Sequence, residues 1–311
     1  MRQRPIRARK GFPTHILVFL APAVLIYTIF MIYPLLDSLR LSLFAGSGPE
    51  AGSFTGLNNY RLLLSDAQWS PRFWGALRNN VVFFAIHMLV QNPLGLLLAL
   101  LLSARVLRGR AIYRTLLFAP TTLSVVIVGF VWQLLLSPLW GIVAGFLKLI
   151  GLGRAFQPWL GLESTALPTL SLISVWQFVG IPMMLFLTAL LAIPDELIEA
   201  ALVDGANAWD TFWRVKFPLI LPAVGIVSVL TFVGNFNAFD LIYATKGALA
   251  GPNFATDLLG TLFYRTFFGF QLQPGNPAMG ATVAMMIFLI LLAGLLLYLF
   301  VWQRRVLTYE L

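Results

Sequence analysis

The sequence predicts an all-α integral membrane protein with six transmembrane helices. Hydrophobic residues make up 59% of the 311 positions, charged residues make up 11%, and the mean hydropathy is +0.86. Soluble globular proteins carry about 25% charged residues, so this composition excludes that class. The apolar residues also gather into six runs of about twenty residues or more, and each run is long enough to cross a bilayer as a helix.

The six runs divide the chain into one membrane domain, residues 14–303, with a short tail at each end, residues 1–13 and 304–311. The predicted spans are residues 15–36, 79–102, 115–136, 169–192, 219–243 and 280–302. A cleaved signal peptide is the alternative for the first run. That run is longer than a typical signal-peptide core and ends without a small-x-small cleavage site, so we expect an uncleaved span.

Basic residues place the predicted spans in the membrane. The net charge is +9, but the lysines and arginines form short clusters beside apolar runs, which is the pattern of the positive-inside rule and not of a nucleic-acid-binding surface. Most of them fall in the N-terminal tail, after the second span, in the loop 193–218 and after the sixth span. We therefore expect both termini in the cytoplasm.

Several kinds of chemistry are excluded or unsupported. The chain has no cysteine, and its two histidines, His15 and His87, do not form a metal-binding spacing. No G-x-x-x-x-G-K-[ST] sequence occurs, so the chain lacks that means of binding ATP phosphates. A membrane enzyme would need a convergent acid–base or metal set, and no such set can be read from the spacing.

Polar residues inside the predicted spans mark a candidate transport path, since such residues rarely face lipid. Asn80, His87 and Gln91 form a polar stripe on one face of the second span. Hydrogen bonding between helices and a place in the transport path explain this stripe equally well. Trp176 and Gln177 lie in the fourth span, in which Gly180 and Pro182 predict a bend.

The fifth span carries the other candidate path residues, which are Asn235, Asn237 and Asp240. Asn237 and Asp240 share a helical face. A carboxylate in this position should have a partner or water.

The loop 193–218 is the most polar long segment in the C-terminal half. Pro194 suits the first position of a helix, Gly205 suits a turn, and Asn207 suits the cap of a second helix that Pro218 would end. Two short helices joined at a glycine outside the lipid form a projection that a partner can bind.

This loop resembles the EAA loop of binding-protein-dependent ABC importer permeases. The matching residues are Glu199, Ala200, Ala201, Asp204, Gly205, Ala206, Phe217, Pro218, Leu219, Leu221 and Pro222. The resemblance extends along nearly the whole chain, and the segment from Phe54 to Tyr60 is similar to the sugar-importing branch.

The resemblance implies the type I ABC importer permease fold and a role in transport, without catalysis by this chain. It implies that residues Glu199 to Asn207 dock on a cytoplasmic ATPase, and that two copies of this ATPase bind the ATP and Mg²⁺. A second permease, an extracytoplasmic solute-binding protein, a mono- or oligosaccharide and a bacterial or archaeal inner membrane complete the expected system. The alternatives are a polyol or glycerol-phosphate permease, or an ion-coupled secondary transporter.

Overall fold

The computed structural model describes residues 14–46, 52–104 and 107–303, and these residues are mostly helical. The predicted tails, residues 1–13 and 304–311, lie outside the described residues. In the described part of the chain, the only strands form a two-stranded hairpin. The predicted all-α class is therefore confirmed.

Four helical segments are long and apolar enough to cross a membrane, covering residues 18–42, 70–103, 208–246 and 277–303. Their parts are α1 (Thr14–Tyr27), η1 (Thr28–Ile32), α2 (Tyr33–Ser42), α4 (Ser70–Ile86), η2 (His87–Gln91), α5 (Asn92–Ser103), α12 (Ala208–Thr211), η5 (Phe212–Lys216), α13 (Phe217–Phe236), α14 (Asp240–Lys246), α16 (Pro277–Leu297) and η6 (Tyr298–Gln303). The second of these begins at Ser70, well before the predicted start at residue 79.

The third and fourth predicted spans are each a pair of bent helices. The pairs are α6 (Arg110–Phe118) with η3 (Ala119–Thr122) against α7 (Val125–Leu135), and α9 (Glu163–Phe178) against α10 (Gly180–Leu191). The α9–α10 bend of 45° confirms the bend predicted from Gly180 and Pro182. The predicted third span, residues 115–136, bends by 95° between η3 and α7, and nothing in the sequence analysis indicated this bend. Pro120 has no backbone N–H, and Ser124 is extended with ψ 131°.

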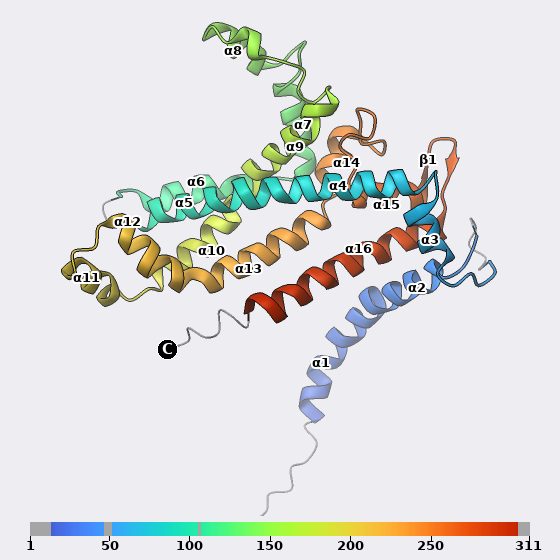
Figure 1. Ribbon diagram of the computed structural model, residues 1–311, viewed down its shortest axis with the longest axis horizontal. Helices are drawn as coiled ribbons and strands as arrows, with labels where there is room; N and C mark the ends of the chain where they lie inside the picture. Colours follow the sequence, from blue (N-terminus) through green and yellow to red (C-terminus); the bar gives the residue numbers. More distant parts are fainter. Residues whose placement is uncertain (1–13, 47–51, 105–106, 304–311) are drawn as a thin grey trace, which may run out of the picture.

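The remaining elements connect the spans. They are α3 (Asn58–Ser65), α8 (Ile142–Leu149), η4 (Gly153–Ala155), α11 (Asp195–Val203), α15 (Leu259–Phe268) and the antiparallel strands β1 (Gly269–Phe270) and β2 (Gln273–Pro274). Figure 1 places α11 and α12 at one end of the molecule, and α3 and β1 at the other. The two sets of loops therefore emerge from opposite ends of the bundle.

Three prolines lie immediately after π-helical turns and do not end their helices. Pro34, Pro93 and Pro218 follow η1, η2 and η5 and occupy the first turn of the next α-helix. A proline ring clashes with the carbonyl four residues earlier, and the wider π turn relieves that clash while the helix continues. The prediction that Pro218 ends a helix is therefore wrong, because η5 continues directly into α13.

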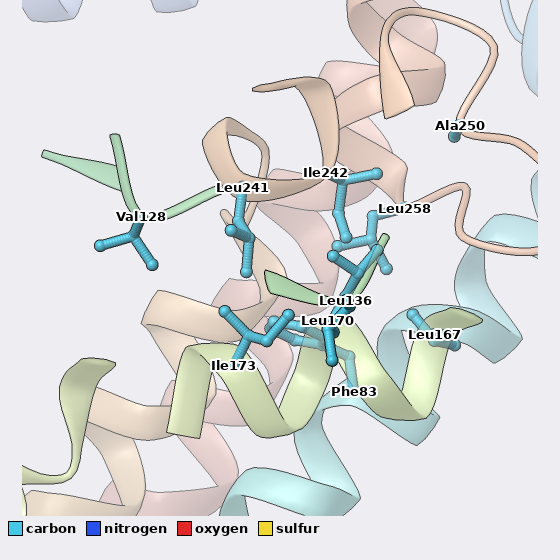
Figure 2. Packing of buried hydrophobic residues seen from close by; sticks show 10 residues of the cluster. All are labelled: Phe83, Val128, Leu136, Leu167, Leu170, Ile173, Leu241, Ile242, Ala250 and Leu258. Carbon is cyan, nitrogen blue, oxygen red and sulfur yellow. The ribbon is translucent and has the colours of Figure 1, made fainter. Parts of the chain in front are cut away.

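The buried core consists of three apolar clusters distributed along the bundle. Figure 2 shows one of them, in which Phe83 of α4, Leu170 and Ile173 of α9, and Leu241 and Ile242 of α14 meet. Because these residues come from three separate spans, the cluster fixes α14 against α4 and α9. This contact places Asp240, at the start of α14, beside the middle of the bundle.

Candidate functional site

In the loop 193–218, the short helix α11 meets a second helix at Gly205, as the sequence predicts. The second helix is not short, because it runs from α12 through η5 into α13. Gly205 has φ +79°, its N–H donates to the Leu202 carbonyl at 3.1 Å, and the Ala206 N–H donates to the Ala201 carbonyl at 2.9 Å. These two bonds and the left-handed glycine form a Schellman motif, which satisfies carbonyls at the end of α11. Asn207 then caps α12, accepting a hydrogen bond from the Asp210 N–H at 2.9 Å.

The surface of this loop carries the features of a docking site. Glu199 and Ala200 are exposed, and Ala201 is half-buried. The apolar side chains of Val203 and Trp209 are 88% and 70% exposed. Contiguous exposed apolar residues of this kind mark a surface that a partner or a membrane covers. Asp204, Gly205 and Asn207 are exposed on the same loop, and Ala206 is half-buried.

A cavity of about 630 Å³ opens beside this loop, between α5, α10, α11 and the start of α6. Asp195 and Glu199 line it together with Arg110 and Lys216, so two carboxylates and two cations share its wall. This mixture of charges can receive a complementary projection from another protein.

A second cavity, of about 430 Å³, lies in the middle of the bundle. We name it the central cavity. Gln91, Asn235, Asn237 and Asp240 all line it, although they come from three separate elements. The second and fifth spans therefore place four of the six predicted path residues around one space. Asn237 and Asp240 are exposed, whereas Gln91 and Asn235 are 6% exposed.

The two other predicted path residues do not line the central cavity. Gln177 is fully buried, and its side-chain Nε2 donates to the Leu123 carbonyl at 3.0 Å, at the break between η3 and α7. Trp176 is 43% exposed and packs edge-to-face on Trp132 at 5.6 Å. Both side chains are held by the bent third span. Their place in a transport path stays a prediction.

The polar stripe on the second span has two different roles. Asn80 is fully buried, donates from Nδ2 to the Asn235 carbonyl at 2.9 Å and accepts from the Leu259 N–H at 2.7 Å. It therefore joins helices. His87 lines the central cavity, where its Nε2 lies 3.0 Å from Ser174 Oγ. Helix–helix hydrogen bonding therefore holds for Asn80, and the place of His87 and Gln91 in a transport path stays a prediction.

Sequence reasoning missed an aromatic group that adjoins Asn237. Phe239 stacks on Tyr243 at 4.9 Å, and Tyr264 contacts both rings at 5.3 and 5.0 Å. Phe239 lines the central cavity and, with Asn237 and Tyr264, a neighbouring cavity of about 380 Å³. Tyr264 lies in a segment that reads as an external loop, and the packing of α15 on α16 brings it here.

The segment between α14 and α15 is held by a buried ion pair. Arg265 Nη2 lies 2.6 Å from Asp257 Oδ2, and the two side chains are 9% and 5% exposed. Thr261 also donates to Asp257, at 2.7 Å, and Arg265 donates to the Ala248 carbonyl at 2.6 Å. Burial raises the pKa of the Asp257 carboxyl, and the Arg265 guanidinium opposes that shift.

Comparison with known proteins identifies the family. A family model described as the binding-protein-dependent transport system inner membrane component matches residues 91–306. The chain is 34% identical to the probable ABC transporter permease protein YurN of Bacillus subtilis, over 88% of this chain and 92% of that protein. It is 31% identical to the lactose transport system permease protein LacF of Rhizobium radiobacter, over 82% of this chain and 83% of that protein.

The fold is also found in a crystal structure of a bacterial ABC transporter involved in the import of the acidic polysaccharide alginate. The TM-score is 0.76 at 23% identity, with 94% of this chain and 96% of that chain covered. The type I ABC importer permease fold is therefore confirmed. The family model covers more than two thirds of the sequence and includes the loop 193–218 and most of the residues that line the central cavity. This chain belongs to the family of binding-protein-dependent transport system inner membrane components.

Proposed function

We propose that this chain is the permease subunit of an ATP-driven ABC importer that moves a mono- or oligosaccharide across a bacterial or archaeal inner membrane. The observation that carries the proposal is the loop 193–218, which forms an exposed, rigidly capped projection at one end of the bundle (Figure 1). The loop leads directly from α10 into α13, and both helices line the central cavity. A force applied to the loop therefore reaches the cavity wall through helices.

In this proposal, the segment from Glu199 to Asn207 docks on a cytoplasmic ATPase. Two ATPase copies bind ATP and Mg²⁺, and their closure moves α10 and α13 relative to α4 and α9. The central cavity then opens alternately to the two sides of the membrane. This chain binds no nucleotide, performs no catalysis, and has both termini in the cytoplasm.

The other partners are a second homologous permease and an extracytoplasmic solute-binding protein. Several relatives support a sugar as the substrate, among them an arabinooligosaccharide transport permease from Bacillus subtilis and the lactose permease described above. A structural neighbour was solved in complex with an alginate pentasaccharide-bound periplasmic protein. Amide and aromatic groups around Asn237 and Phe239 suit sugar hydroxyls and sugar faces.

Co-purification tests the subunit role. The tagged chain, expressed with the proteins of its own transport system, should recover an ATPase and a second permease. A secondary transporter would work without either. Reconstituted vesicles should accumulate a sugar only with ATP and a binding protein, and uptake without both would contradict the proposal. A panel of sugars, polyols and glycerol phosphates then separates the candidate substrates.

Cysteine labelling tests the sidedness, since the chain has no cysteine of its own. Val203 and Leu272 are 88% and 99% exposed at opposite ends of the molecule. A Val203→Cys variant should react with an impermeant maleimide only from the cytoplasm, and a Leu272→Cys variant only from outside. The reverse pattern would invert the topology and remove the ATPase docking role.

A further inference from the structure

Among the described residues, Asp240 is the one acidic side chain that lines the central cavity. Asp240 is exposed on its wall, and the structure gives its carboxylate no ion pair or hydrogen bond. No lysine or arginine is among the described residues that line the central cavity or the neighbouring cavity around Tyr264. His87 is the other ionisable group in the wall, and its two ring nitrogens are taken by the Phe83 carbonyl and Ser174 Oγ.

The polar groups in the wall add to this negative potential. The side-chain oxygens Gln91 Oε1 and Asn235 Oδ1 are buried, and neither has a hydrogen-bond partner among the described residues. Each leaves the negative end of an amide dipole uncompensated beside the cavity. The helices α7 and α14 both begin at the cavity wall, with Val125 and Asp240, and each start carries a positive dipole. Asp240 occupies the first turn of α14 and offsets the dipole of that helix.

We propose that the central cavity takes neutral sugars and rejects anionic solutes, such as uronate-containing sugars and sugar or polyol phosphates, and that Asp240 sets this preference. The inference rests on the proposed function, because it names the substrate class of the same cavity. A low-dielectric wall with one unpaired carboxylate repels a second anion, whereas neutral hydroxyl groups donate hydrogen bonds to carboxylate and amide oxygens.

Charged thiol reagents measure this potential without knowledge of the substrate. A single cysteine is introduced at the cavity wall by Asn237→Cys in the complete transporter complex. Its reaction rates with cationic trimethylammonium-ethyl and anionic sulfonatoethyl methanethiosulfonate are compared, each divided by the rate with a free small thiol. The Asp240 carboxylate attracts the cationic reagent and repels the anionic one. At a separation of about 6 Å, even with the dielectric constant of bulk water, the two effects together make the cationic reagent react about tenfold faster at low ionic strength.

The decisive variant adds Asp240→Asn, which keeps the size of the side chain and removes its charge. The tenfold preference should fall to about two- or threefold or less. A Leu272→Cys thiol, which lies outside the cavity lining, should show the same rate ratio with and without Asp240→Asn. This control separates a local field from a general change in the complex.

Two outcomes overturn the inference. One is equal or faster reaction of the anionic reagent with the Asn237→Cys thiol, which would mean that the partner permease supplies cations to the cavity. The other is a cationic preference that Asp240→Asn leaves unchanged. Protection of the Asn237→Cys thiol by a transported sugar tests the proposed function separately. If the Asn237→Cys thiol prefers the cationic reagent, but no sugar protects it or is transported, the sugar path is refuted and the inference about charge still stands.

Discussion

Replacement of Gly205 tests whether the geometry of the loop 193–218 transmits ATPase movement. Gly205 has φ +79°, and a Cβ placed there meets no atom within 4 Å. The cost of a larger side chain is therefore conformational, with no steric clash in this chain. An L-residue in the left-handed region costs about 1–2 kcal/mol, and a β-branched one has the greater strain. At about 1.4 kcal/mol per tenfold, Gly205→Val should reduce the population of this turn about five- to thirtyfold.

The apparent affinity for the ATPase should fall by the same factor, because only the native turn presents the docking surface. The measurements are the amount of ATPase recovered at limiting concentration and the substrate-stimulated ATP hydrolysis in vesicles. Gly205→Asn should stay close to the wild type, since asparagine tolerates the left-handed region. Gly145→Val is the matched control, because Gly145 in α8 also has open space around it but no positive φ.

Two results would refute this reasoning. Normal ATPase recovery and normal stimulation in Gly205→Val would show that the turn is not part of the coupling element. An equal loss in Gly205→Asn and Gly205→Val would show that the left-handed backbone is not the property that matters.

Three further predictions concern the docking loop, the path and the ion pair. Glu199→Ala should lower ATPase recovery tenfold or more, because loss of one partner from a desolvated charge pair costs about 2–5 kcal/mol. The control Glu196→Gln should leave ATPase recovery unchanged. Equal recovery with both variants would contradict a role of Glu199 in ATPase docking. Asn237→Leu should reduce sugar transport and leave subunit recovery unchanged, and normal transport would remove Asn237 from the path. Arg265→Met should destabilise the fold by about 3–5 kcal/mol in thermal unfolding, because a buried carboxylate loses its partner. The exposed Arg214→Met control should show a loss below about 1 kcal/mol, and similar unfolding of the two variants would argue against that reasoning.

The sequence determined the membrane class, the apolar runs and the turn within the loop 193–218, because these depend on local properties. Apolar run length and charge clustering act within a single segment, so they can be read without tertiary contacts. The turn at Gly205 and the cap at Asn207 are also local, since their hydrogen bonds close within a few residues. The side of the membrane on which the loop lies stays a prediction.

The tertiary structure decided which polar residues meet. Asn235, Asn237 and Asp240 lie on one segment, but only the packing of α4, α9 and α14 shows that they face Gln91 across a common cavity. Periodicity places a side chain on a helical face and does not say which neighbour covers that face.

The course of the helix at Pro218 and the position of the break in the third span could also be known only from the folded structure. Pro218 reads as a helix end, yet the π turn η5 carries the helix past it. Leu123 accepts a hydrogen bond from Gln177, which lies far away in the sequence, and this contact stabilises the break in the third span. Such contacts depend on residues that only the folded chain brings together, so the shape of the transport path could not be read from the sequence alone.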